Sequence, residues 1–229
     1  LHYPLRRQRQ MCIRDRFDGG SSSEDQVGRY RILPYMKYLG YQKIQIAVIS
    51  HMDIDHYSGI KELLEMGKIK YLGLPEIPKD ATMKKIIGIA KKRGTTIFYL
   101  SRGRQITTKD GSLKVLHPQK NSQMEKNAAS LVMQGKILGY RVLLTGDVEK
   151  EGEEELLSEE LERADILKAA HHGSKNSTSN EFLQKVQPKQ TVISCGKQNR
   201  YGHPHLETIH RLQTLSLIHI SEPTRPLYI

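Results

Sequence analysis

Residues 44–56 read IQIAVISHMDIDH, an apolar stretch that runs directly into four potential metal ligands. The β-branched and apolar run at its start predicts a buried strand. His51, Asp53 and Asp55 follow two residues apart, so in an extended segment their side chains point to one side. His56 then begins a predicted helix. Imidazoles and carboxylates directly after a buried strand indicate a divalent metal site. The competing interpretation is a polar loop in which Asp55 caps the helix.

Two further predicted strands end in potential ligands. The run LLTG leads to Asp147, which can bridge two metal ions, and the glycine before it allows a close approach of the backbone. The strand predicted over 165–170 leads to His171 and His172. Neighbouring residues on an extended chain face opposite ways. We therefore expect one of the two histidines to bind metal and the other to orient it or to contact substrate.

A fourth polar segment, 199–205, follows the last predicted strand. Arg200 offers a planar set of donors that suits a phosphate group. His203 can donate a proton to an oxyanion or a leaving group. A surface turn is the competing interpretation of this segment. His117 with its following proline, and residues 127–130, are weaker candidates of the same kind.

The chain between these segments alternates strand and helix, which predicts one layered α/β domain. Thr178 and Glu181 form a predicted capping box at the start of one helix. The predicted helices are 27–39, 56–66, 83–92, 149–162 and 178–186, and the predicted strands are 44–49, 69–74, 96–100, 112–117, 130–134, 137–145, 165–170 and 190–195.

The composition is that of a globular domain with a basic excess. Hydrophobic residues make up 37% and charged residues 27%, and no apolar run approaches the length of a membrane span. The formal net charge of +11 indicates a polyanionic partner such as nucleic acid, although a lysine-rich solvated surface explains it equally well. Two cysteines, Cys12 and Cys195, exclude a disulfide framework, and no disulfide-linked partner is expected.

The two ends of the chain differ from the rest. They contain MCIRDR and LIHISEPTRP, which resemble translated sequencing-adapter read-through. We expect residues 1–16 and 213–229 to be non-native or disordered tails, and residues 17–212 to form the domain. Ordinary flexible termini are the alternative.

The motifs, in this order, resemble those of the metallo-β-lactamase superfamily, whose signature is HxHxDH. Asp53 stands where the second histidine is usual. That variant, with LLTGD, HHGS and YGHPH downstream, resembles the C-terminal domain of ComEC-type competence proteins, from Phe17 to Leu212. The resemblance implies an αββα sandwich, truncated at both ends, with the metals at one edge of the two sheets. The family has strands before the position of Asp18 and further strand and helix material after that of Leu212, and we expect both to be missing from this chain.

The resemblance leads to a working hypothesis of metal-assisted phosphodiester hydrolysis. Paired ions lower the pKa of a shared water to about 7 and stabilise charge on the phosphate. The additional carboxylate favours manganese, with zinc next. The predicted ligands are His51, Asp53 and Asp147 for one ion, and Asp55, His56, Asp147 and His171 for the second. The predicted catalytic residues are Asp55, Asp147 and His203, and the predicted substrate-binding residues are His172, Ser174, Lys175, Asn199 and Arg200.

The resemblance also implies a substrate and a location. In the family, this domain is thought to degrade the DNA strand that is not transported. We expect sequence-independent binding of single-stranded or double-stranded DNA. The expected partner is the transmembrane channel domain of a parent protein. The expected location is the extracytoplasmic face of the bacterial cytoplasmic membrane, although this sequence shows no signal or transmembrane segment. Two alternatives stay open: a hydrolase of a small ester, lactone or phosphodiester, and a module that binds DNA without cutting it.

Overall fold

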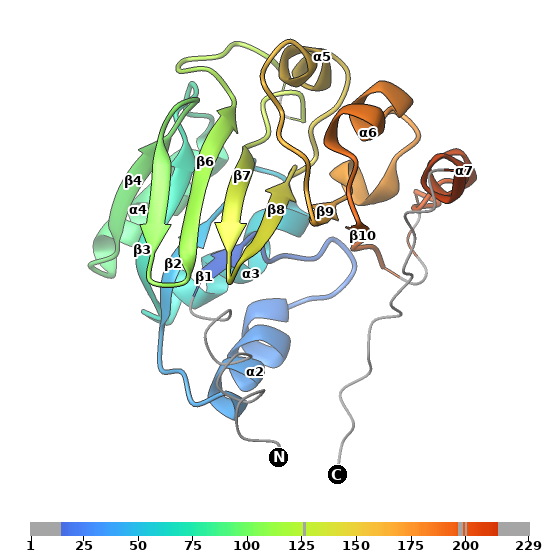
Figure 1. Ribbon diagram of the computed structural model, residues 1–229. Helices are drawn as coiled ribbons and strands as arrows, with labels where there is room; N and C mark the ends of the chain where they lie inside the picture. The colour runs from blue at the N-terminus through green and yellow to red at the C-terminus, as the bar shows by residue number, and fades with distance from the viewer. Residues whose placement is uncertain (1–14, 126, 197–198, 200, 215–229) are drawn as a thin grey trace.

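The computed structural model describes residues 15–125, 127–196, 199 and 201–214, and its first sheet consists of four parallel strands in the order β1-β2-β3-β4 (Figure 1). Helices connect these strands, as parallel neighbours require. The strands are β1 (Asp15–Phe17), β2 (Ile44–Val48), β3 (Ile69–Pro75) and β4 (Thr96–Leu100), and the connecting helices are η1 (Gly28–Ile32), α2 (Leu33–Tyr38), α3 (Ile54–Glu65) and α4 (Ala81–Lys92).

The second sheet has six strands in the order β10-β9-β8-β7-β6-β5. Neighbours from β5 to β8 are antiparallel, whereas β8, β9 and β10 run parallel. Its elements are β5 (Gln105–Thr108), β6 (Gly111–His117), β7 (Val132–Ile137), β8 (Tyr140–Leu144), α5 (Glu151–Leu157), β9 (Ile166–Lys168), η2 (Ala170–Gly173), α6 (Asn180–Val186), β10 (Gln190–Val192) and α7 (Leu206–Thr214).

Three apolar layers hold this arrangement together. One joins α2, α3 and α4 to the first sheet, for example through Leu63 and Leu72. A second lies between the sheets and includes Val48 and Met133. The third joins the second sheet to α5, α6 and α7, with Phe182 among its buried residues. Helices therefore cover the outer face of each sheet, which confirms the predicted αββα sandwich. Within the described ranges, no helix has the length and apolar character needed to cross a bilayer.

The hairpin between β7 and β8 differs from its prediction. The predicted strands were 130–134 and 137–145, whereas the turn lies at Leu138 and Gly139. Both residues have positive φ, 52° and 86°, as the tight turns of two-residue hairpins require. Leucine is an unusual residue at such a position, so the sequence did not signal this turn. β5 was not predicted either, because its sequence QITT has little apolar character.

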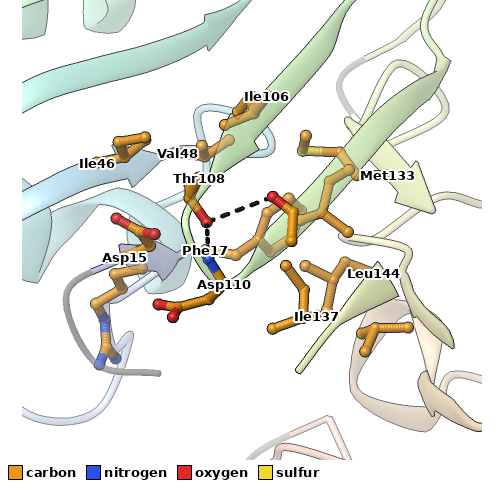
Figure 2. Close-up of a pocket in the computed structure, with 14 residues that line it drawn as sticks. Asp15, Phe17, Ile46, Val48, Ile106, Thr108, Asp110, Met133, Ile137 and Leu144 are labelled. Atoms are coloured by element: carbon orange, nitrogen blue, oxygen red, sulfur yellow. Dashed lines mark hydrogen bonds between the residues drawn. The ribbon is translucent and has the colours of Figure 1, made fainter. Parts of the chain in front are cut away.

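A cavity of about 230 Å³ remains between the two sheets (Figure 2). Apolar side chains from both sheets line it, including Phe17, Val48, Met133 and Leu144. Among the described residues that line it, none is a predicted site residue. The cavity therefore belongs to the interior of the sandwich, and the site lies elsewhere.

Most of the two predicted tails lie outside the described residues, namely 1–14 and 215–229. Of the described elements, the first begins at Asp15 and the last ends at Thr214. The domain boundaries at residues 17 and 212 stay a prediction.

Candidate metal centre

Strand β2 delivers the first site residues to the edge of its sheet. Ser50 and His51 follow the strand, and both are buried. The Ser50 hydroxyl lies 3.1 Å from Nδ1 of His51, whose Nε2 lies 3.6 Å from Oδ2 of Asp53. Asp53 immediately precedes α3 but makes no side-chain capping hydrogen bond. Asp55 lies inside the first turn of α3, so the alternative in which Asp55 caps this helix is wrong.

His56, in the same helical turn, is held between two carboxylates. Its Nδ1 lies 2.9 Å from Oδ2 of Asp18, and its Nε2 lies 3.0 Å from Oδ2 of Asp147. Ser50 fixes Asp18 in turn, because its backbone N–H donates to Oδ1 at 2.7 Å and its hydroxyl donates to Oδ2 at 2.8 Å. A carboxylate that holds one imidazole nitrogen orients the other toward a ligand position. Asp18 therefore directs Nε2 of His56 toward Asp147.

Asp147 is buried just after β8, and the imidazoles converge on its Oδ2 atom. This atom lies 3.0 Å from Nε2 of His56, 3.4 Å from Nε2 of His172 and 3.9 Å from Nε2 of His171. Three histidines, one on α3 and two consecutive ones after β9, thus present the same ring nitrogen to one carboxylate oxygen. This geometry suits a carboxylate that is shared between metal ions.

The neighbours of Asp147 fix its position. Its backbone N–H donates to the Ser130 hydroxyl at 3.2 Å. The Lys168 ammonium lies 3.4 Å from Oδ1 and donates to the carbonyl of Gly146 at 2.8 Å. Gly146 has φ +54°, and a Cβ on it would lie 2.9 Å from that of Ser50. A side chain at residue 146 would therefore force apart the two strand ends that carry the ligands.

His171 and His172 both reach the site because the chain does not stay extended after β9. Both residues have positive φ, 44° and 53°, so the prediction of an extended chain with rings on opposite sides is wrong here. Nδ1 of His172 lies 2.5 Å from the carbonyl oxygen of Ser194, and its Nε2 lies 3.1 Å from Oδ2 of Asp55. Nδ1 of His171 lies 2.7 Å from Oε1 of Glu149. In each ring, an acceptor holds Nδ1, and Nε2 is the nitrogen that faces Oδ2 of Asp147.

The segment after β10 places a further ring beside this cluster. The ring of His203 lies 5.2 Å from that of His171 and 6.2 Å from that of His172, measured between centroids. Asn199 shapes the segment, because its side-chain amide donates to the His203 carbonyl and its Oδ1 accepts from the His203 N–H at 2.9 Å. Arg200 lies outside the described residues.

Ser174 and Lys175 follow the two histidines. Ser174 is buried, and its hydroxyl donates to Oε1 of Glu149 at 2.7 Å. The backbone N–H of Lys175 donates to Nδ1 of His205 at 3.3 Å. The Ser174 hydroxyl therefore contacts the same carboxylate that holds His171, and Lys175 joins the histidine loop to the segment after β10.

Opposite charges in the cluster shift the pKa values of its groups. Burial lowers the pKa of His56, but the carboxylates of Asp18 and Asp147 outweigh burial and raise it to about 10. Burial also lowers the pKa of His172, yet contacts with carboxylates, Asp147 first, raise it to about 9. Burial raises the pKa of the Asp147 carboxyl, but Lys168 and the two histidines hold it well below its usual value. Without a metal, both histidines are therefore imidazolium partners of carboxylates.

The donor atoms fit a divalent metal. Two groups of three residues have ligand atoms within 4.8 Å of one another: His51, His56 and Asp147 form one, and Asp55, His56 and His172 form the other. The Nε2 atoms of His51, His56 and His172 are buried and make no hydrogen bond of acceptable geometry. Carboxylate oxygens nevertheless lie 3.0 to 3.6 Å from them. Imidazole nitrogens and carboxylate oxygens bind borderline and hard divalent ions. These nitrogens therefore point to a metal position.

Three residues of this centre were not predicted as site residues: Asp18, Glu149 and Lys168. The contacts that define them join distant segments, since Asp18 and Ser50 are 32 residues apart and Lys168 and Gly146 are 22 apart. No strand was predicted before Asp18, because residues 1–16 were expected to form a tail, so its position after β1 is visible only in the structure. For Lys168 the signal was a single charge in the otherwise apolar run before His171.

Glu153 supports the histidine loop from α5. Its buried carboxylate accepts the backbone N–H of Thr178 at 2.6 Å and that of Ser179 at 2.8 Å. Ser179 is the N-cap of α6, and its hydroxyl accepts the N–H of Phe182. The N-cap of α6 is therefore Ser179 and not Thr178, so the predicted capping box at Thr178 and Glu181 is wrong by one residue. In that box the Glu181 carboxylate would accept the Thr178 N–H, but Glu153 accepts it instead.

We expect Glu153→Gln to lower the free energy of unfolding by about 1–3 kcal/mol, because its amide offers one acceptor oxygen for two buried N–H donors. Urea denaturation of the full chain measures this difference. The exposed Glu154 on the same helix provides the matched control, Glu154→Gln. Equal losses in the two variants would contradict this role of Glu153.

The chain matches known proteins in sequence and in fold. The family model described as Metallo-beta-lactamase superfamily matches residues 17–197. ComE operon protein 3 of Bacillus subtilis (strain 168) is 37% identical over 196 residues, which cover 83% of this chain and 25% of that protein. Competence protein ComA of Neisseria gonorrhoeae is 30% identical over 195 residues, which cover 82% of this chain and 25% of that protein. The chain thus spans about a quarter of the length of these relatives.

Solved structures support the fold. The crystal structure of the metallo-beta-lactamase fold protein YhfI from Bacillus subtilis aligns with a TM-score of 0.54 at 15% identity, and covers 86% of this chain and 79% of that chain. Igni18, described as a novel metallo hydrolase from Ignicoccus hospitalis KIN4/I, aligns with a TM-score of 0.52 at 16% identity over 81% of this chain and 79% of that chain. The resemblance predicted from the motifs is confirmed.

Proposed function

The chain belongs to the metallo-β-lactamase superfamily, with ComEC-type competence proteins as relatives, and we propose that it is a two-metal phosphodiesterase that cleaves DNA during competence-related DNA uptake. The fold implies a metal-dependent hydrolase. The observation that carries the proposal is the convergence of three imidazole Nε2 atoms on Oδ2 of Asp147, within 3.0 to 3.9 Å.

The donor atoms divide between two ion positions. Asp18 holds Nδ1 of His56, so only Nε2 of this ring can bind a metal. His56 belongs to both groups of ligand atoms but can bind a metal in only one of them at a time. We assign His56 to the group with Asp55 and His172. His51 and Asp53 would then hold the other ion, and Asp147 would be a ligand available to both. His171 completes the centre, with its Nε2 3.9 Å from that oxygen. Three carboxylate ligands make this a hard site, which favours manganese over zinc.

Two ions so placed would supply a metal-bound water as nucleophile and a positive field for the phosphate. The protein's own groups provide orientation. Asp18 and Glu149 fix the rings of His56 and His171 through their Nδ1 atoms. His203, beside the cluster, is placed to donate an N–H to a phosphate oxygen or to the leaving group. Lys168 adds a fixed positive charge behind Asp147.

DNA as the substrate is supported by charge and by the names of the relatives. Residues 1–16, the predicted tail, hold five arginines and one aspartate, or +4 of the formal +11, and the remaining +7 favours a polyanion over a small neutral ester. Two of the relatives are named for competence or for its operon. Because those proteins are about four times longer than the matched segment, we propose that this domain acts beside a transmembrane channel domain of its parent, at the extracytoplasmic face of the membrane.

Elemental analysis followed by a nuclease assay tests this function. The purified chain should contain transition metal, and Mn²⁺ should support cleavage of labelled single-stranded and double-stranded oligonucleotides that EDTA stops. Hydrolysis of a chromogenic ester without DNA cleavage would instead support the small-ester hydrolase. DNA binding without bound metal or cleavage would support the non-catalytic module.

A further inference from the structure

Exposed apolar side chains flank the candidate metal centre. Among the described residues, Ile54 lies between Asp53 and Asp55 and is 53% exposed, and Tyr201 lies two residues before His203 and is 55% exposed. Single exposed apolar side chains are common on protein surfaces, but these two lie beside a cluster of charged ligands. Their position suggests contact with a substrate that has both charged and flat apolar parts.

Tyr201 continues a row of rings that begins in the cluster. The ring of Tyr201 stacks on that of His203, with centroids 5.9 Å apart and planes at 26°. The ring of His203 lies 6.2 Å from that of His172, with planes at 23°. A row of three rings, each tilted by 26° or less from the next, thus leads from a candidate metal ligand to the surface. His203 supports the tyrosine ring in a fixed orientation, while more than half of that side chain stays exposed.

Basic residues lie on the same flank of the site. The backbone N–H of Lys175 donates to Nδ1 of His205, two residues beyond His203. The Arg211 guanidinium on α7 donates to the carbonyl oxygens of Lys175 at 3.2 Å and Ser177 at 3.0 Å. Proteins that hold single strands combine cations for the phosphate backbone with an aromatic ring for a base. Here the Arg211 guanidinium fixes the loop that carries Lys175, the exposed Lys175 side chain supplies the cation, and Tyr201 supplies the ring.

We propose that Tyr201 stacks on a base of single-stranded nucleic acid next to the scissile phosphate, so that the site prefers single-stranded to double-stranded DNA. Base faces inside a duplex are already stacked on each other, and only an unpaired strand can offer a face to the tyrosine ring. This inference rests on the proposed phosphodiesterase function and adds the substrate form that the site selects.

Two measurements on the full chain test the inference. The first is KM for cleavage of one oligonucleotide as a single strand and as a duplex, with Mn²⁺. The second is the affinity for the same strand carrying 2-aminopurine, whose fluorescence is quenched by stacking, measured in EDTA so that no turnover is needed. Tyr201→Ala should raise KM and Kd for the single strand about tenfold and leave those for the duplex within about twofold.

Two variants define the controls. Tyr201→Phe should stay within about twofold of the wild type, because stacking does not need the hydroxyl group. Tyr38→Ala removes another exposed tyrosine, on α2, and should change neither constant. Thermal denaturation should show that all three variants fold.

The remaining outcomes overturn the inference. Equal losses for single strand and duplex, no change in Tyr201→Ala, or a Tyr201→Phe variant as weak as Tyr201→Ala would each exclude base stacking, while wild-type DNA cleavage would leave the proposed function standing. A wild-type chain that neither cleaves nor binds DNA would remove the proposed function, and this inference with it.

Discussion

Asp147→Asn should reduce kcat/KM for oligonucleotide cleavage by about 1000-fold or more and lower the bound metal content. Loss of a group that only orients a metal ligand typically costs about 10–100-fold in affinity or activity. We expect a larger loss for Asp147 than for a group that only orients a ligand. Its Oδ2 lies within 3.9 Å of three imidazole nitrogens, and its Oδ1 lies 3.4 Å from Lys168. One substitution therefore removes the negative charge that the two proposed ion positions would share.

Asparagine keeps the size of the side chain, so the packing around residue 147 should survive. Its amide is neutral and offers one acceptor oxygen, so it cannot face both Lys168 and the histidines as a carboxylate does. Elemental analysis should show less metal per chain, and the same preparation should show the loss of cleavage.

Asp25→Asn is the control, because Asp25 is exposed and lies in the loop between β1 and η1. It should keep wild-type metal content and cleavage. An Asp147→Asn variant with full metal content and cleavage close to that of the wild type would contradict the shared role of this carboxylate.

The sequence predicted which residues gather in this cluster better than the way the chain brings them together. An apolar strand that ends in HMDIDH and a second that ends in Asp147 predicted a metal site, while the alternation of strands and helices and the family resemblance predicted the fold. The signals for the metal site are local. They are a run of β-branched residues, potential ligands spaced two residues apart, and a glycine directly before a carboxylate. Each can be recognised within about ten residues.

The arrangement of His171 and His172 could not be predicted in the same way. Residues 165–170 continue a strand pattern, and histidine adopts positive φ only in a minority of cases. The conformation arises from distant contacts: Glu149 holds one ring, Ser194 holds the other, and Glu153 fixes the backbone a few residues later. None of these contacts has a signature at residues 171 and 172 themselves.

The same reasoning applies to Asp18 and Lys168. A carboxylate and an ammonium beside strands are common on protein surfaces, and the sequence does not tell a solvated charge from a buried one. Their roles appear only when the two sheets meet, because Asp18 follows β1 of the first sheet and Lys168 ends β9 of the second. Both then contact ligands of the centre, His56 and Asp147 respectively.

Without metal, the chain should be most stable between about pH 4 and pH 6.5 and should lose stability as the pH rises toward 10. The pKa of His56 rises from 6.5 to about 10 on folding, and that of His172 rises to about 9. A raised pKa stabilises the folded state fully below 6.5, and this contribution disappears as the pH passes the folded value. The pKa of Asp147 is lowered, so its contribution is present above 3.8 and is lost as the pH falls below that.

Urea denaturation of the EDTA-treated chain at pH 5, 7 and 9 measures this dependence, and we expect a decrease on the order of a few kcal/mol from pH 5 to pH 9. His56→Gln should flatten much of the decrease, because the neutral amide cannot lose a proton. His210→Gln, which changes an exposed histidine on α7, should keep the wild-type slope. A slope unchanged in His56→Gln would show that the decrease has another source.

Without metal, stability should fall as the pH rises above 6.5, whereas the stabilisation that a bound metal adds should increase with pH. A divalent ion binds the unprotonated Nε2 of His56 and must displace the proton that Asp18 and Asp147 stabilise there. Metal binding therefore competes with protons, and the rise in Tm caused by Mn²⁺ or Zn²⁺ should grow from pH 6 to pH 9. Differential scanning fluorimetry of one preparation with and without metal measures both trends. A metal-induced shift that stays constant over this range would mean that the ion binds away from His56 and His172, at a position that the imidazoles do not define.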